Sequence, residues 1–308
     1  MTSRHGASIA VVGSINADTT YQVPHLPAPG ETILGTSRLD APGGKGANQA
    51  AAVAALGAAV DFVGAVGADD AGASLSAGLA KRGVGLSHLV SIPATPTGSA
   101  VIVVSDSGEN SIVVHPGANA ELSPAHITAY FSDCSPEIVL TQCEIPLETV
   151  QAIGESFSGT LIVNPAPMPG RGAALEAVIA RANILVPNRT ELAALAGTAV
   201  PLTVDDVVAC ARGLSFSGDL VVTLGSEGAL CFPGGSQVTP VMVESPRVDA
   251  LDTSGAGDAF CGALAVAIQQ GKELVEAVEA ANAVASWSVT QPGAQVGNTI
   301  PTFAAEKS

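Results

Sequence analysis

The chain has 308 residues, of which 47% are hydrophobic and 13% charged, a composition that predicts a large packed core and excludes disorder outside the termini. We expect one α/β domain over residues 1–308 with a small appendage. The formal net charge of −16, with only 12 scattered Lys and Arg residues, excludes nucleic acid as a partner, because phosphate binding needs clustered positive charge.

Short β-branched runs alternate with Ala- and Leu-rich helical stretches. This alternation predicts a doubly wound, mainly parallel sheet flanked by helices. Such sheets bind ligands outside the carboxyl ends of their strands. The expected strands are Ile9–Gly13, Val60–Val66, Glu137–Gln142, Thr160–Asn164, Asn183–Asn188 and Asp219–Gly225.

The segment Ser99–Asn119 breaks the alternation, because its two β-runs are separated by the turn-rich Ser105–Asn110. This pattern predicts a hairpin outside the main sheet. With the Pro-rich region Thr19–Leu39, the hairpin is expected to form a small β-sheet lid from about residues 17–42 and 98–116. The exposed edges of such a lid favour pairing with the lid of a second subunit, and hence a homodimer.

The strongest chemical motif is DTSGAGD, Asp252–Asp258, which precedes an apolar helical stripe. Gly255, Ala256 and Gly257 would form an anion hole, since glycines let the first helical N–H groups approach an anion and the helix dipole favours negative charge there. Asp258 would then accept a proton from an attacking hydroxyl. The alternative for Asp258 is helix capping.

A second motif, PGGKGANQ at Pro42–Gln49, opens an Ala-rich helix. Its glycines allow close backbone approach, and Lys45 and Asn48 offer donors suited to hydroxyl groups; a simple helix-start turn is the alternative. The chain contains no G-x-x-x-x-G-K-[ST] and no complete G-x-G-x-x-G after a strand. A Walker-type ATPase and a Rossmann dehydrogenase therefore lose support.

Cysteine usage and the N-terminus predict a cytoplasmic protein. The five cysteines are odd in number, widely spaced and without a C-x-x-C pair, as in a reducing compartment. The first apolar stretch is soon interrupted by Asn16 and Asp18, which argues against a signal peptide. The segment Ala50–Ala68 contains Asp61 and predicts a packed helix and strand, with no membrane span.

Ordered motifs extend through nearly the whole chain. They are GSINAD at Gly13–Asp18, PGGKGANQ, G-x-D-x-x-G at Gly67–Gly72, HPGAN at His115–Asn119, NPAP at Asn164–Pro167, N-x-x-E at Asn188–Glu191, TLGSEG at Thr223–Gly228, DTSGAGD and GAQ at Gly293–Gln295. Through these motifs the sequence resembles the ribokinase family within the PfkB group of carbohydrate kinases.

The resemblance implies a sugar pocket. In it, Asn16 and Asp18 would hold sugar hydroxyls, a role that suits a carboxylate accepting from two adjacent hydroxyls. The residues that would complete the pocket are Gly44, Lys45, Asn48, Glu144 and Asp258. The alternatives are a polar turn for Asn16 and Asp18 and a solvated loop acid for Glu144.

The resemblance also implies a nucleotide site and two cation sites. ATP would lie against Asn188, Thr223, Gly225, Ser226, Gly228, Gly257 and Asn282. Glu191 would order Mg²⁺ through water, with a first-turn helix acid as its alternative. K⁺ would be held by Asp252, Ser254, Ser288, Gln291, Gly293 and Gly297. Family members can carry serine where this chain has Gly297, so a side-chain ligand is absent there.

The implied activity is ATP-dependent phosphorylation of D-ribose at O5, with Asp258 as general base. The first alternative is a related kinase acting on 2-deoxyribose, another sugar or a nucleoside. The second is a sugar-binding regulator without catalysis, against which the complete GAGD loop argues.

Overall fold

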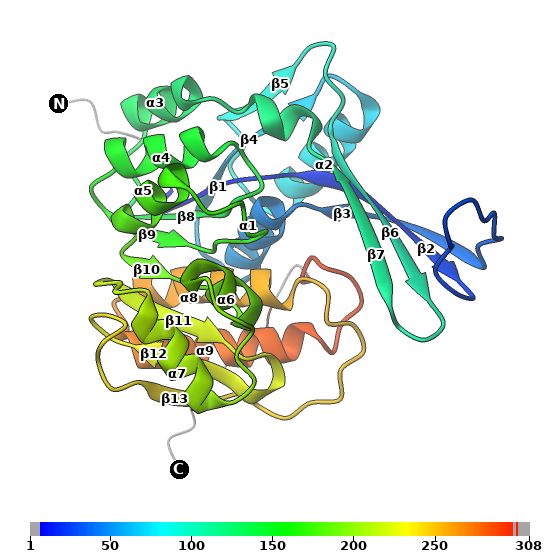
Figure 1. The fold of residues 1–308 in the computed structure, drawn as a ribbon. Helices are drawn as coiled ribbons and strands as arrows, with labels where there is room; N and C mark the ends of the chain where they lie inside the picture. The colour runs from blue at the N-terminus through cyan, green and yellow to red at the C-terminus, as the bar shows by residue number, and fades with distance from the viewer. Residues whose placement is uncertain (1–6, 298–299, 301–308) are drawn as a thin grey trace.

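The computed structural model describes residues 7–297 and residue 300, and strands and helices alternate along the described chain (Figure 1). The strands of the main sheet are β1 (Ile9–Val12), β4 (Val60–Gly67), β5 (Leu89–Ile92), β8 (Ile138–Thr141), β9 (Thr160–Val163), β10 (Ile184–Leu185), β11 (Asp219–Thr223), β12 (Gly228–Phe232) and β13 (Val241–Glu244). Their order is β13-β12-β11-β10-β9-β8-β1-β4-β5. All pairs from β11 to β5 are parallel, and β12 and β13 join antiparallel, which confirms the doubly wound, mainly parallel fold.

The central strands are apolar because both faces of the sheet are covered. All four residues of β1 are fully buried, with Ile9 and Val11 on one face and Ala10 and Val12 on the other. Strand β10 is shorter than expected. Pro187 has no N–H group to donate, although its carbonyl accepts from Thr223 N at 3.0 Å.

Nine helices of the described chain cover the two faces of the sheet. One face carries α1 (Lys45–Ala55), α2 (Asp70–Lys81), α8 (Ala256–Gln269) and α9 (Leu274–Ser288). The other carries α3 (Pro124–Asp133), α4 (Leu147–Ser156), α5 (Ala173–Arg181), α6 (Arg189–Ala196) and α7 (Val204–Gly213). Short 3₁₀ turns η1 (Gly117–Glu121) and η2 (Gly225–Glu227) complete the chain.

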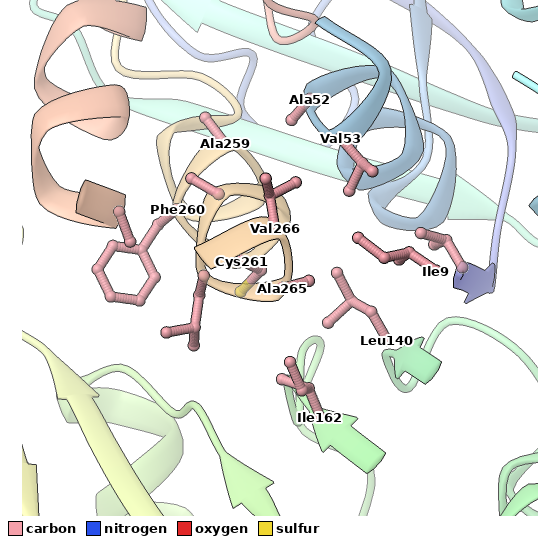
Figure 2. Close-up of a cluster of buried hydrophobic side chains, with 14 of the residues drawn as sticks. Ile9, Ala52, Val53, Leu140, Ile162, Ala259, Phe260, Cys261, Ala265 and Val266 are labelled. Carbon is pink, nitrogen blue, oxygen red and sulfur yellow. The ribbon is translucent and has the colours of Figure 1, made fainter. Parts of the chain in front are cut away.

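Helices α1 and α8 pack closely over the sheet. Figure 2 shows side chains of α8 lying beside Ala52 and Val53 of α1 and above Leu140 and Ile162 of the sheet. A Cβ on Gly262 would lie 2.7 Å from the Ala52 Cβ, so glycine permits this approach. The first turns of two helices about 200 residues apart in sequence therefore meet.

A second sheet projects from the body of the molecule (Figure 1). Its strands are β2 (Asn16–Val23), β3 (Ser37–Gly43), β6 (Gly98–Ser105) and β7 (Asn110–His115), in the order β3-β2-β6-β7. Strands β6 and β7 form the expected hairpin. The register places Leu39, Ile112 and Val114 on one face, where they are 62%, 54% and 49% exposed.

Asp69 anchors the start of β6. Its carboxylate caps α2 by accepting from Gly72 N at 2.8 Å and also accepts from Thr97 N at 2.8 Å. The hydroxyl of Thr97 accepts from Gly67 N at 2.9 Å. The G-x-D-x-x-G motif thus ties β4, α2 and the residue before β6 together.

The helices within residues 7–297 give no indication of a membrane-spanning segment. Within residues 7–297, none combines the length and hydropathy that crossing a bilayer requires.

Candidate active site

The N-terminus of α8 opens onto a cavity of about 140 Å³. Gly255 is the N-cap residue at φ 70°, and a Cβ there would lie 2.1 Å from Ala294 O, so both conformation and packing require glycine. A Cβ on Gly257 would meet open space. No side chain caps this helix, so its first N–H groups are available to an anion.

Asp258 lies in the first turn of α8, with 6% of its surface exposed. Its Oδ2 accepts from Asn48 Nδ2 at 2.9 Å and its Oδ1 from Gln49 Nε2 at 3.1 Å. The helix cap is Gly255, so the capping alternative for Asp258 is wrong. Burial raises the pKa of Asp258, while the Lys45 ammonium and the two amides limit the rise. A buried carboxylate with a raised pKa suits a general base.

The cavity brings many of the expected site residues together. Its lining includes Lys45, Asn188, Glu191, Thr223, Gly255, Ala256, Gly257 and Asp258. They come from the starts of α1, α6 and α8 and the end of β11, at the carboxyl ends of the parallel strands. This is where ligands bind in doubly wound sheets.

Lys45 is the cation of this site. Burial opposes its charge, yet neighbouring carboxylates, Asp258 first among them, raise the pKa of the ammonium. Lys45 therefore remains protonated at neutral pH and offers a positive charge beside the α8 N-terminus. Its backbone N–H donates to Glu144 Oε2 at 3.1 Å.

Asp18 lies at the base of the second sheet, against Gly43. A Cβ on Gly43 would lie 1.9 Å from Asp18 Oδ2, so only glycine leaves room for the carboxylate. Among the described residues, Asp18 Oδ1 is buried without a hydrogen-bond partner. Burial, followed by the charge of Glu144, raises the pKa of Asp18 to about 6. Such an unpaired oxygen is suited to accept from a ligand hydroxyl.

The neighbouring sugar-site candidates are held by other segments. Asn16 Oδ1 accepts from Asn119 Nδ2 at 2.8 Å. The Ser14 hydroxyl donates to Glu144 Oε2. Glu144 therefore links the segment after β8 to the segment after β1, and it is not a free loop acid. Gly44 is the N-cap of α1 at φ 87°, where a Cβ would lie 2.6 Å from Ile15 Cα.

Asn188 and Glu191 form a reciprocal cap on α6. Glu191 Oε2 accepts from Asn188 N and its Oε1 from Asn188 Nδ2, both at 2.9 Å, and Glu191 N donates to Asn188 Oδ1 at 2.8 Å. Burial raises the pKa of Glu191, and the bonds from Asn188 oppose the rise. Each carboxylate oxygen accepts one of these bonds and can accept another, and Glu191 lines the cavity, so the residue fits an outer-sphere role toward hydrated Mg²⁺.

The expected monovalent-cation residues are only partly assembled. Asp252 accepts from Ser254 N and from Gly293 N, both at 2.9 Å, and Gln291 N donates to Ser288 O at 3.0 Å. The Ser288 hydroxyl donates to Ala285 O at 2.8 Å. Gly297 lies toward Trp287, whose Cη2 would be 4.0 Å from an added Cβ.

The remaining nucleotide-site candidates spread beyond the cavity. Gly225 and Ser226 are exposed in η2. A Cβ on Gly228 would lie 2.1 Å from Val243 O, so strand packing explains this glycine. Asn282 is buried, and its Nδ2 donates to Val243 O at 2.9 Å.

Several polar residues of the site were not predicted from the sequence. Gln49 and Gln142 are buried beside Asp258, the half-buried Asn164 accepts from Gln49 Nε2 at 3.4 Å, and Asn119 binds both the N–H and the carbonyl of Ile15 between β1 and β2. The motifs PGGKGANQ, NPAP and HPGAN contain three of them, and the fourth follows β8 directly. For Gln142 and Asn164, the available signal was a polar residue at the carboxyl end of a parallel strand.

A larger cavity, about 530 Å³, lies between α2 and strands β2 and β3. Of the expected site residues it reaches only Asp18. The chemistry therefore belongs to the smaller cavity at the α8 N-terminus.

Comparison with known proteins gives a consistent result. The family described as pfkB family carbohydrate kinase matches residues 7–301. A ribokinase of Bacillus subtilis is 38% identical over 294 residues, covering 94% of this chain and 95% of the relative. A deoxyribokinase of Salmonella typhi is 35% identical, covering 93% and 94%. The structure of an Arabidopsis thaliana ribokinase complexed with ribose and ATP superposes with a TM-score of 0.79 at 32% identity, covering 94% and 95%.

Proposed function

Because the chain belongs to the pfkB family of carbohydrate kinases, we propose that it phosphorylates D-ribose at O5 with ATP, giving D-ribose 5-phosphate and ADP. That it transfers a phosphoryl group from ATP to a sugar follows from the family and its relatives. The observation that carries the proposal is the buried Asp258 beside an uncapped helix N-terminus. Ribose as the acceptor is supported by the ribokinase relatives.

In this mechanism Asp258 takes the proton of the O5 hydroxyl as that oxygen attacks the γ-phosphorus. The O5–P bond forms while the bond to the bridging oxygen of ATP breaks, which releases ADP. The first N–H groups of α8 and the Lys45 ammonium stabilise the charge on the transferred group. Asn16, Asp18 and Glu144 hold the sugar. One of its hydroxyls donates a hydrogen bond to Asp18 Oδ1, which is otherwise unpaired among the described residues.

Two cations belong to the proposal. Glu191, held by Asn188, would bind the hydration shell of Mg²⁺, which when present neutralises phosphate charge. K⁺ would lie against Asp252 and the carbonyl groups of the 288–293 turn. Its influence on the anion hole would pass through Ala294, which contacts Gly255.

We further infer a cytoplasmic homodimer. The exposed apolar side chains of the second sheet favour burial against the same sheet of a second copy, so this sheet would be both lid and interface. Cys143, Cys210, Cys231 and Cys261 are free thiols, as expected in a reducing compartment.

The test is ADP release from Mg·ATP with ribose, 2-deoxyribose, fructose, adenosine or no sugar, each in K⁺ and in Na⁺. Strong preference for ribose supports the proposal, and faster release in K⁺ supports the cation site. If no acceptor raises ADP release above the level without sugar, the result would contradict sugar phosphorylation and favour a binding protein.

A second acceptor, 2-deoxyribose, is favoured by one observation. The deoxyribokinase of Salmonella typhi is nearly as similar to this chain as the ribokinases are. Preference for 2-deoxyribose in the same panel would identify it as the substrate in place of ribose, and it would leave the fold and the proposed base unchanged.

A further inference from the structure

A chain of buried amides leads to the catalytic carboxylate. Gln142 Nε2 donates to Gln49 Oε1 at 2.5 Å, and Gln49 Nε2 donates to Asp258 Oδ1 at 3.1 Å. Gln49 and Gln142 are fully buried, and neither is among the residues that line the cavity. Gln142 and Asp258, which lie 93 and 209 residues along the chain from Gln49, therefore both contact its side chain.

The direction of these hydrogen bonds follows from Asp258. An ionised carboxylate only accepts, so Gln49 must turn its NH₂ group toward Asp258 and its carbonyl toward Gln142. Gln142 must then donate, which leaves its own carbonyl oxygen, Oε1, buried without a partner among the described residues. A buried unpaired acceptor is destabilising. Reversing both amides would let Gln142 Oε1 accept from Gln49, but it would place the Gln49 carbonyl against the Asp258 carboxylate, so the charge of Asp258 selects the observed direction.

Gly13 makes room for the unpaired oxygen. A Cβ on Gly13 would lie 2.0 Å from Gln142 Oε1 and 3.0 Å from Gly46 Cα. The backbone of the GSINAD motif therefore accommodates the Gln142 amide in the orientation that donates toward Gln49.

We propose that Gln49 and Gln142 are positioning residues, which together orient the Asp258 carboxylate toward the sugar hydroxyl and stabilise its charged form. This proposal rests on the assignment of Asp258 as the base. Asn48 donates to the second carboxylate oxygen, so each oxygen accepts one amide bond and can accept another, and Asp258 lines the cavity. The other charged or titratable groups near the carboxylate are Lys45 of α1, Glu144 after β8, Glu191 of α6 and Cys261 of α8.

The first test compares Gln49→Leu and Gln142→Leu with the wild type over pH 5–9, using the preferred sugar. Loss of the Gln49 donor is expected to lower kcat about 10- to 100-fold, as for a hydrogen bond to a charged group. The acidic limb of the kcat–pH profile should also shift to higher pH by about one unit, because the ionised base has lost a hydrogen-bond donor. KM for the sugar should stay within about twofold, since neither glutamine lines the cavity.

The isosteric variant Gln142→Glu provides the sharper readout. A buried neutral glutamic acid would still donate an O–H to Gln49, so turnover near pH 6 should approach that of the wild type. Ionisation at higher pH removes the donor, and a new alkaline loss of about tenfold is expected by pH 9. A purely structural role would give the same loss at every pH. Because Gln142→Glu preserves volume, it remains informative even if the leucine variants fail to fold.

Two controls separate the possible failures. Gln151→Leu removes an amide that donates to Glu155 of the same helix, and it should leave the pH profile unchanged. Asp258→Asn tests the base itself, and normal turnover there would overturn the proposed function. If Asp258→Asn is inactive while Gln49→Leu and Gln142→Glu keep the wild-type pH profile, the positioning role of the two glutamines is overturned and the base assignment stands.

Discussion

Asp18 should reduce the stability of the empty enzyme, and Asp18→Asn should therefore stabilise it. Burial, followed by the charge of Glu144, raises the pKa of the Asp18 carboxyl from 3.8 to about 6, and among the described residues its Oδ1 has no hydrogen-bond partner. An asparagine of the same shape removes the charge, and its carbonyl can keep the bond that the carboxylate accepts from the Ala100 backbone.

The size and the pH dependence of this effect follow from the pKa change. A rise from 3.8 to about 6 corresponds to about 3 kcal/mol, and solvent screening at a partly exposed side chain lowers the expected gain to about 1–2 kcal/mol. The folded state binds the proton more tightly than the unfolded state. Protonation therefore stabilises the wild type fully below pH 3.8, and this stabilisation is lost as the pH rises through about 6.

The assay is urea unfolding of the sugar-free protein at pH 8 and pH 5. Asp18→Asn should be more stable than the wild type at pH 8, and the difference should fall by roughly half at pH 5. Asp106→Asn, at an exposed aspartate in the β6–β7 turn, should show neither effect. The same Asp18 variant should bind ribose at least about tenfold more weakly. A stability difference that is absent at pH 8, or that grows at pH 5, would refute the reasoning.

Three further predictions concern the base, the anchor and the interface. Asp258→Asn should lower kcat at least about 100-fold in a coupled ADP assay while folding is retained; near-normal turnover would contradict the base assignment. Asp69→Ala removes the α2 cap and the bond to Thr97, and thermal unfolding should show a loss of about 1–2 kcal/mol; an unchanged melting curve would argue against the anchor. Ile112→Asp should convert a dimer to a monomer in sedimentation experiments, whereas a monomeric wild type would exclude the interface.

The core of the fold was readable from the sequence because its central strands are buried on both faces. Ile9–Val12 and Ile138–Leu140 are short continuous apolar runs, and a helix lies between each of them and the next strand of the main sheet. Strands β12 and β13 at the antiparallel edge were not predicted. Strand β12 begins at Gly228 inside a glycine-rich motif, and β13 is largely exposed, so neither has the pattern of a buried parallel strand.

The site was predictable where one local segment carries the chemistry. The motif Asp252–Asp258 combines glycines, a helix start and an acid, so the proposed anion hole and the proposed base both follow from seven consecutive residues. The partners of Asp258 could not be inferred in the same way. Gln49 and Gln142 lie in separate segments, and only the packing of α1 and α8 on the sheet brings their amides to the carboxylate.

Because the proposed base on α8 is held by residues of α1, we expect the enzyme to become active late in its synthesis. Gln49 and Asp258 are 209 residues apart, so at roughly 5–20 residues per second the ribosome adds the base roughly 10–40 s after α1. Throughout that interval the alanine-rich face of α1 lacks the helix that later covers it. A nascent chain whose central strands have already paired therefore lacks both the proposed anion hole and the proposed base, and we expect it to consume no ATP until α8 has packed on α1.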